Sequence, residues 1–223
     1  MVLWRRSPRS RASPERGVFL EPLADCLHAV HDQARVEAGD RVVVVGAGVM
    51  GLQLVALAAR AEGRVLVVEP RDDRRQVACQ LGAEEGVGPE DWPAAVREWS
   101  EGAGANVVIV AVGSTAAIRA AMDAAAPGGR IVAFAGFGTE PEARLDLNLL
   151  HYRELTIVGS EWIGTPPNQR RERYRESLAL LQSGDLTLER LVDRRCPLDE
   201  AADALSRFAS HGAIKTVIEM KGT

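Results

Sequence analysis

The chain has 223 residues, a formal net charge of −4 at pH 7 and 46% hydrophobic residues, which excludes a fully disordered protein. No apolar run reaches the roughly 18 residues of a membrane-spanning helix, so the sequence predicts no membrane partner. The acidic balance gives no electrostatic reason to bind nucleic acid. Three widely separated cysteines favour the reducing cytoplasm over a disulfide-rich compartment.

The first 17 residues differ from the rest of the chain in charge. They contain five arginines against the single acid Glu15, and they lack the apolar core of a secretory signal. This pattern predicts a disordered basic tail over residues 1–17, or a start codon placed in the wrong position. A targeting peptide is the alternative interpretation.

Helical and extended patterns alternate from residue 18 onwards. Apolar residues at helical spacing predict a first helix over 19–36, and continuous apolar runs predict strands that are buried on both faces. The expected strands are 41–45, 64–69, 106–112, 131–135 and 155–159, and the later helices are 52–61, 72–81, 91–99, 115–126 and 165–181. The alternation is typical of an α/β protein with a Rossmann-type doubly wound parallel sheet. We assign this domain, with its leading helix, to residues 18–184.

Residues 185–223 have a different rhythm. A short strand near 191–193, a helix over 198–208 and a last strand over 215–219 are expected there. These pieces lack an obvious sheet of their own, so we treat them as a separate C-terminal segment.

A glycine-rich turn follows the first strand directly. In Gly46-Ala47-Gly48-Val49-Met50-Gly51, the first glycine allows a tight turn, the second lets the backbone approach a pyrophosphate, and the third lets helix and strand pack closely. The helix that begins at Val49 and Met50 offers free N–H groups and a positive dipole end to phosphates. The pattern predicts dinucleotide binding; a fold that keeps the loop without the ligand is the alternative.

Glu69 ends the second strand, 18 residues beyond Gly51. A carboxylate there accepts hydrogen bonds from the adenosine ribose hydroxyls and repels a 2′-phosphate, which predicts NAD(H) rather than NADP(H). Arg74 joins the expected cofactor-binding set. Arg71 and Arg74 leave three interpretations open: compensation for a phosphate, stacking on adenine, or solvated charges at a helix start.

Several short runs along the chain carry a resemblance to a known family. These are Glu21–Ala24, Leu27–Val30, Gly39–Val42, Gly46–Gly51, Gly82–Ala83, Val112–Gly113, Gly128–Gly129, Gly136, Pro197–Ala201 and Lys215–Ile218. Together they resemble the middle of a zinc-dependent medium-chain dehydrogenase, of the sorbitol and threonine dehydrogenase branch. The resemblance covers roughly residues 18–220, the latter two-thirds of such an enzyme. It adds Val112, Gly113 and Gly136 to the expected cofactor-binding residues. It implies hydride transfer between a secondary alcohol or polyol and a nicotinamide, and it implies that residues 185–223 return to a catalytic domain.

The resemblance also implies a catalytic zinc held by Cys and His side chains of an N-terminal domain. Here no Cys precedes Cys26 and no His precedes His28. A tetrahedral catalytic site needs three protein ligands, so we expect no metal and weak or absent turnover by this chain alone. Glu21, which resembles the family's second-sphere or exchangeable zinc carboxylate, is the one catalytic candidate, and is otherwise a helix-cap acid.

Two further functions stay open. One is a non-catalytic nucleotide-binding or assembly protein derived from a dehydrogenase. The other is a metal-free NAD-dependent enzyme that takes its acid and base from Glu21, His28, His151 or Tyr152. The small-molecule substrate is not defined by the sequence.

Association through the last strand of the sheet is expected. Leu155, Ile157 and Val158 would make 155–159 an apolar edge without Lys or Pro. Related dehydrogenases join two sheets there, so the resemblance implies a homodimer. Two polar features carry open interpretations: Ser114 either bonds the cofactor or caps a helix, and the charged run 170–176 is expected to be a solvated helix face.

Overall fold

The computed structural model of the protein describes residues 14–138, 141–207 and 212–220. A six-stranded parallel sheet with the order β3-β2-β1-β4-β5-β6 forms its centre. Its strands are β1 (Arg41–Val45), β2 (Arg64–Val68), β3 (Glu85–Val87), β4 (Ala105–Val110), β5 (Ala125–Ala133) and β6 (Thr156–Gly159). The chain moves outward in one direction from β1 to β3 and in the other from β4 to β6. This is the predicted doubly wound arrangement, in which ligands bind beyond the carboxyl ends of the strands at the switch point.

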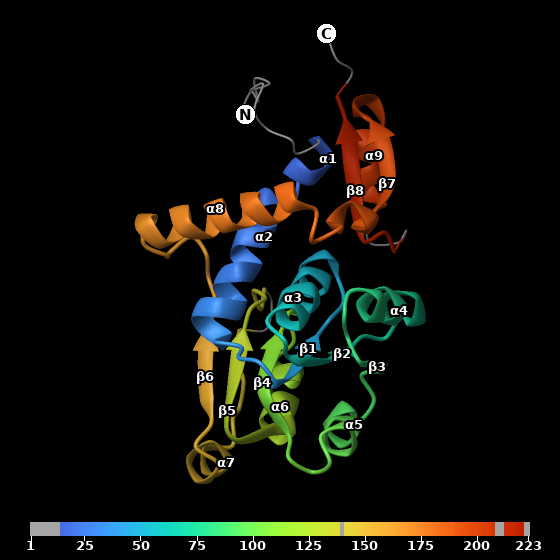
Figure 1. The fold of residues 1–223 in the computed structure, drawn as a ribbon. Coiled ribbons are helices and arrows are strands. Elements are labelled where there is room, and N and C mark those ends of the chain that lie inside the picture. Colours follow the sequence, from blue (N-terminus) through green and yellow to red (C-terminus); the bar gives the residue numbers. More distant parts are fainter. Residues whose placement is uncertain (1–13, 139–140, 208–211, 221–223) are drawn as a thin grey trace.

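Helices cover both faces of this sheet (Figure 1). One face packs against α2 (Leu20–Leu27), its continuation η1 (His28–Ala34) and α3 (Val49–Arg60). The other face packs against α5 (Trp92–Trp99) and α6 (Thr115–Ala124). Three more helices lie around these layers: α4 (Asp72–Gln80), α7 (Leu147–Tyr152) and α8 (Pro167–Ser183). The last of them crosses α2, so the first long helix is covered on its outer side (Figure 1).

The central strands supply both cores. Along β1, Val42 and Val44 face α2 and α3, whereas Val43 and Val45 face α5 and α6. All four are at most 6% exposed. Full burial of one such side chain stabilises the fold by about 1.5–3 kcal/mol, which is why strands in the middle of a covered sheet are continuous apolar runs.

The helix expected over 19–36 divides into two parts. After α2 the chain continues as the π-helix η1 and ends at Arg35, which has a left-handed φ of 54°. The wider turn lets Gln33 Nε2 donate to His28 Nε2, five residues away, at 3.1 Å, while His28 Nδ1 donates to Asp32 Oδ2 at 2.9 Å. The apolar spacing does not reveal this widening, because it keeps one buried face in either case.

Other differences between the expected and observed elements have local causes. Two short elements were not expected from the sequence: β3 has three residues, too few to show a periodic pattern, and α7 has six. The carboxylate of Asp146 caps α7 by accepting from the N–H groups of Asn148 and Leu149 at 2.9 and 3.0 Å. The helix expected over 115–126 ends at Ala124, and β5 begins at Ala125. Alanine favours a helix at this position, but pairing with β4 overrides that local preference.

The C-terminal pieces do form a sheet, so the expectation that they lack one is wrong. β7 (Val192–Pro197) and β8 (Lys215–Glu219) pair in parallel, apart from the main sheet (Figure 1). The carboxylate of Asp193 accepts from the N–H groups of Ile214 and Lys215 at 2.7 and 3.1 Å. Between and before these strands lie the short helices η2 (Leu188–Leu191), η3 (Leu198–Glu200) and α9 (Ala201–Ser206). Charged residues interrupt β7, which hides its strand pattern.

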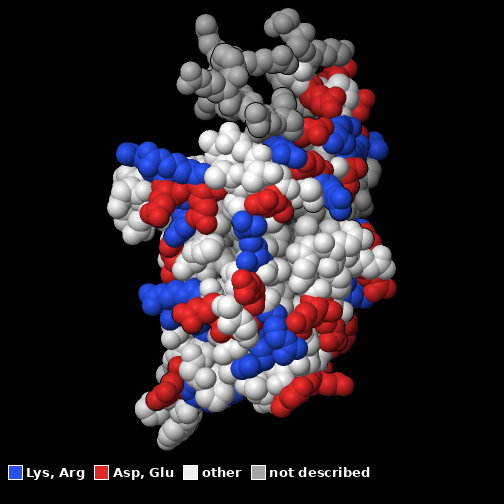
Figure 2. Space-filling model, viewed as in Figure 1, with Lys and Arg blue, Asp and Glu red and all other residues white. Residues whose placement is uncertain are grey.

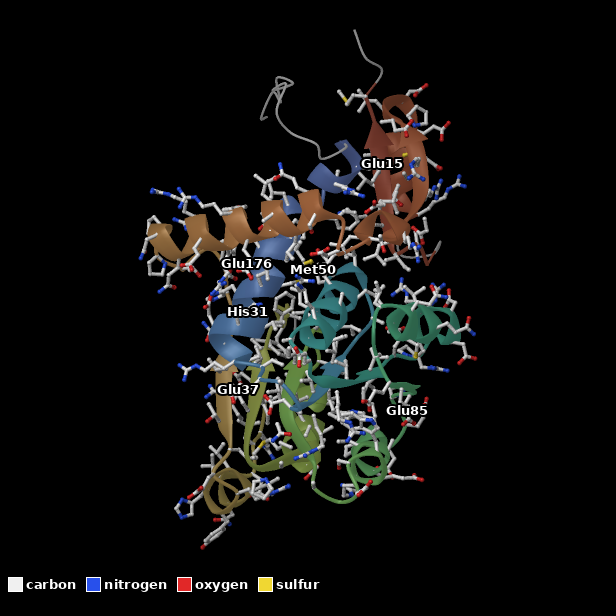
Figure 3. All side chains as sticks on the ribbon, in the orientation of Figure 1. Glu15, His31, Glu37, Met50, Glu85 and Glu176 are labelled. Carbon is white, nitrogen blue, oxygen red and sulfur yellow. The ribbon has the colours of Figure 1, made fainter. Side chains whose placement is uncertain are left out.

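The boundary of the expected basic tail also needs correction. Residues 1–13 lie outside the described residues, but Pro14–Gly17 form a helical turn, α1. Arg16 Nε and Nη2 donate to Glu189 Oε1 at 3.0 and 2.8 Å, and Nη1 donates to the Leu181 carbonyl at 3.0 Å. Glu15, labelled in Figure 3, pairs with Arg195 at 2.8 Å. Ion pairs from two elements therefore fix residues that composition alone assigned to a tail.

The surface carries mixed charge. Figure 2 shows Lys and Arg interspersed with Asp and Glu over the face in view. Within the described residues, no helix is both long and apolar enough to cross a membrane.

Candidate functional site

The glycine turn between β1 and α3 is fixed by its own backbone. Gly46 has a φ of +101°, a conformation that favours glycine. A Cβ on Gly51 would lie 1.9 Å from the Gly46 carbonyl oxygen, so only glycine lets α3 begin directly on the turn. Gly48 has nothing within 4 Å of its Cβ position and faces open space. The turn therefore leaves room for a ligand beside the free N–H groups of the α3 N-terminus.

The leading helix α2 lies against the start of α3. Cys26 Sγ donates to the Met50 carbonyl at 3.6 Å, and Met50 is labelled at this junction in Figure 3. Gln53 is fully buried, and its amide donates to the Val49 carbonyl at 2.9 Å. Val49 and Met50 are thus held in the first turn of α3, where the sequence placed them.

Glu69 lies just beyond β2 and is only 5% exposed. Its Oε2 accepts from the Ala47 N–H at 2.8 Å, and its Oε1 accepts from the Arg71 N–H at 3.2 Å. The carboxylate therefore joins the glycine turn to the end of the neighbouring strand. Each carboxylate oxygen accepts more than one hydrogen bond, so Glu69 keeps acceptor capacity for a ligand.

A cleft of about 510 Å³ lies beside this turn. Gly46, Glu69, Arg74 and Val112 line it, all of which the sequence predicted as cofactor-binding. Val112 approaches Gly46 so closely that a Cβ on that glycine would lie 2.5 Å from Val112 Cγ1. The ends of three neighbouring strands thus meet at one opening.

The remaining predicted residues follow β4 and β5. A Cβ on Gly113 would lie 2.6 Å from the carbonyl oxygen of Gly136, so these two turns touch at the carboxyl edge of the sheet. The helix-cap interpretation of Ser114 is confirmed, because its Oγ accepts from the Ala117 N–H at 3.3 Å. The residue also lines the cleft, and its hydrogen bond to a cofactor stays a prediction.

Sequence reasoning missed Pro89 and Trp92, which also line the cleft. Both follow β3, the strand too short to be predicted. Trp92 is 4% exposed and packs into the core beneath the cleft. The sequence signal that could have indicated Trp92 is its position as a large aromatic residue at the beginning of the helix expected from residue 91.

Acidic side chains gather on α2 next to the glycine turn. Burial, reinforced by the negative charges of Glu21 and Glu161, raises the pKa of Asp25 from 3.8 to about 7. Its Oδ1 is buried and has no hydrogen-bond partner among the described residues. Glu21 lies one turn earlier and is exposed. Burial also raises the pKa of the Cys26 thiol, so this cysteine stays protonated.

The histidines considered from the sequence do not gather beside the glycine turn and the acids of α2. His28 is 4% exposed and uses both ring nitrogens, since Nδ1 bonds Asp32 and Nε2 accepts from Gln33. His31 lies on the outer side and pairs with Glu176 of α8 at 3.8 Å (Figure 3). His151 and Tyr152 belong to α7, which leads into β6 at the amino edge of the sheet, opposite to the glycine turn.

A metal requires ligands that come together. In the ranges 14–138, 141–207 and 212–220, no group of three or more His, Cys, Asp or Glu side chains is placed to hold a metal ion. The acids that act on one another beside the glycine turn, Glu21, Asp25 and Glu161, offer oxygen atoms only, whereas zinc prefers nitrogen and sulfur ligands. The described residues therefore do not fit a catalytic zinc.

Comparison with known proteins identifies the family. The zinc-binding dehydrogenase family matches residues 37–183. The chain is 34% identical over 199 residues to 2-dehydro-3-deoxy-L-galactonate 5-dehydrogenase of Pseudoalteromonas atlantica, covering 88% of this chain and 54% of that protein. It is 29% identical to D-xylulose reductase of Saccharomyces cerevisiae, covering 92% and 58% of the two chains. The chain belongs to the zinc-binding dehydrogenase family of medium-chain dehydrogenases.

Solved structures agree with this assignment. Alcohol dehydrogenase TADH from Thermus sp. ATN1 superposes with a TM-score of 0.84 at 28% identity, covering 97% of this chain and 62% of that one. A zinc-binding dehydrogenase from Sinorhizobium meliloti 1021, solved with NADP bound, gives 0.83 at 30% identity, covering 93% and 60%. The chain spans little more than half the length of the relatives it matches.

Proposed function

We propose that this chain binds NAD(H) in the cleft beside the glycine turn and takes part in hydride transfer between nicotinamide and a secondary alcohol or polyol. One observation carries the proposal: Glu69 holds the Ala47 N–H at 2.8 Å while Gly48 faces open space. The names of the relatives, among them a xylulose reductase and an alcohol dehydrogenase, support the reaction class.

Each residue has a defined part in this proposal. Gly48 leaves room for the pyrophosphate, and the α3 N-terminus stabilises its charge. Glu69 accepts from the hydroxyls of the adenosine ribose. When bound, the nicotinamide supplies the group that accepts or releases hydride. The chain's own contribution is to position the dinucleotide across the carboxyl edge of the sheet.

The buried carboxylate also favours NAD(H) over NADP(H), because it repels a 2′-phosphate. Titration calorimetry with NADH and NADPH tests this preference. We expect NADH to bind about tenfold more tightly, which corresponds to roughly 1.4 kcal/mol. Equal or tighter binding of NADPH contradicts the role of Glu69.

A substitution at Gly48 tests the location of the site. We expect Gly48→Val to abolish NADH binding, because its side chain occupies the space of the pyrophosphate, and to leave unfolding by urea nearly unchanged, because that space is open. Gly164→Val is the matched control, since Gly164 also has nothing within 4 Å of its Cβ position. NADH binding by Gly48→Val at wild-type affinity would refute the proposal.

We propose that turnover by this chain alone is weak. Among the described residues, Glu21 interacts with the carboxyl of Asp25 and with the ammonium of Lys215, neither of which replaces a Lewis acid at the alcohol oxygen. The same observation favours a second candidate, a non-catalytic nucleotide-binding or assembly protein. NADH binding without alcohol-dependent NAD reduction supports the second candidate, and zinc-independent reduction supports an enzyme. Either protein is proposed to act in the cytoplasm as a homodimer.

A further inference from the structure

Two arginines beside Glu69 are engaged by the segment that precedes β8. Arg71 Nη1 donates to the Gly212 carbonyl at 2.9 Å. Arg74 Nη2 donates to the same carbonyl at 3.1 Å and to the Ala213 carbonyl at 3.3 Å. Residues far apart in the sequence therefore meet at the start of α4, next to the carboxylate that is expected to bind ribose.

This segment is itself anchored. Asp193 of β7 accepts from the N–H groups of Ile214 and Lys215 at 2.7 and 3.1 Å, directly after Gly212 and Ala213. The two carbonyl groups are thus presented to the arginines from a fixed position. The contact joins the small C-terminal sheet to the cofactor side of the main domain.

The arginines keep capacity for another acceptor. Arg71 is also held by Asp73, whose Oδ1 accepts from Nε at 3.0 Å. Arg74 lines the cleft together with Glu69, and its Nε–H is buried without a partner among the described residues. A carbonyl is a weaker acceptor for guanidinium than a phosphate, which accepts charge-assisted and bidentate hydrogen bonds.

We propose that the carbonyl groups of Gly212 and Ala213 determine cofactor selectivity by engaging guanidinium donors of Arg71 and Arg74 that would otherwise bind the 2′-phosphate of a dinucleotide. The inference rests on the proposed NAD(H) binding and deepens it. Glu69 repels the phosphate, and the segment before β8 occupies donors of the two arginines that would otherwise compensate for the charge of the phosphate.

The structure offers a direct way to break this contact. Gly212 has a φ of +65°, and a Cβ there would lie 1.9 Å from Arg71 Nη1 and 2.9 Å from its Cζ. A side chain at this position must displace the guanidinium of Arg71. The arginine is then free to turn towards the cleft.

The test is titration of NADH and NADPH into wild type and Gly212→Val. We expect the affinity for NADPH to rise about tenfold, as one new charge-assisted hydrogen bond allows, and the affinity for NADH to change far less. Adding Arg71→Ala and Arg74→Ala to Gly212→Val should return NADPH to its wild-type affinity. Gly39→Val is the matched control, because Gly39 has a φ of +83° and nothing within 4 Å of its Cβ position.

A second variant covers the case in which Gly212→Val does not fold. Asp193→Ala removes the anchor of the segment together with a negative charge that acts on Arg71, and it should shift the same NADPH-to-NADH ratio in the same direction. An unchanged ratio in a folded variant, with NADH binding intact, overturns the selectivity role alone. Failure of the wild type to bind NADH overturns the proposed function and this inference with it.

Discussion

The acidic end of α2, which carries Glu21 and Asp25, lies next to the glycine turn. A hydrogen bond from Cys26 to the Met50 carbonyl joins the two regions, but the turn is defined by backbone and the acidic end by side chains. Backbone geometry defines the turn, where Gly51 packs on the Gly46 carbonyl. Side chains define the acidic end, where Asp25 keeps a buried oxygen without a partner among the described residues. A site made of backbone is complete within one short stretch, whereas an acid–base site needs contributions from several elements.

The strongest test of this contrast is Gly51→Val. Its Cβ would meet a backbone oxygen at 1.9 Å, so β1 and α3 must move apart. We expect a loss of about 3 kcal/mol in the free energy of unfolding, at the upper end of the usual effect of overpacking, together with loss of NADH binding. Urea unfolding followed by circular dichroism measures the first effect, and calorimetry measures the second.

Gly164→Val again serves as the control, because no neighbour opposes its side chain. Comparison with Gly48→Val separates the two roles of the turn. Gly48→Val should lose binding and keep stability, whereas Gly51→Val should lose both. Wild-type stability in Gly51→Val would show that packing of α3 on the turn does not define its geometry.

The acidic end is tested by the pH dependence of Asp25→Asn. The pKa of Asp25 is raised to about 7 in the folded chain, so the folded state holds a proton that the unfolded state has lost. Stability therefore falls as the pH rises from about 4 to about 7. Solvent screening of this partly exposed group reduces the effect, and we expect Asp25→Asn to gain about 1–2 kcal/mol at pH 8 and nothing at pH 4.

Urea titrations at the two pH values measure this difference. Asp199→Asn, on the exposed helix η3, is the control for loss of a negative charge. An equal gain at both pH values would mean that burial does not hold the Asp25 carboxyl protonated near neutrality.

The same contrast explains what the sequence can predict. The strands and the glycine turn follow from local patterns: four consecutive valines follow Arg41 in β1, Gly46 takes a positive φ, and Gly51 packs on the Gly46 carbonyl. The doubly wound order then follows from the alternation of strands and helices. These features depend on residues that are close in the chain.

Long-range contacts were not predictable in the same way. The pairing of β7 with β8, the approach of Gly212 to Arg71, and the position of Trp92 beneath the cleft each join segments without a shared local signal. The polar residues of the π-helix η1 also contact α8, where Arg173 donates to Asp32 at 2.7 and 3.0 Å. The solvated face expected over 170–176 is thus partly an interface.

That network gives a smaller prediction. Burial of Asp32 alone would raise its pKa, but hydrogen bonds from Arg173 and His28 outweigh it, so the pKa is lowered. The stabilisation is present above the unfolded pKa, near 3.9, and is lost as the pH falls through the still lower folded value. We expect Arg173→Met to lose about 1 kcal/mol at pH 7 and less at pH 2. Arg175→Met, on the exposed side of α8, is the control.

The smallest effect on stability, and the sharpest on association, is expected at the edge of the sheet. β6 is an edge strand, but Ile157 and Val158 each pack partly against a core, so replacing them would disturb the fold as well as pairing. Gly159 is exposed and has nothing within 4 Å of its Cβ position. If β6 joins two sheets in a homodimer, Gly159→Asp places like charges across a two-fold axis and should yield monomers with an unchanged urea midpoint. Sedimentation at micromolar concentration measures the oligomeric state. Gly159→Ala is the control and should remain a dimer. A wild type that sediments as a monomer contradicts the homodimer.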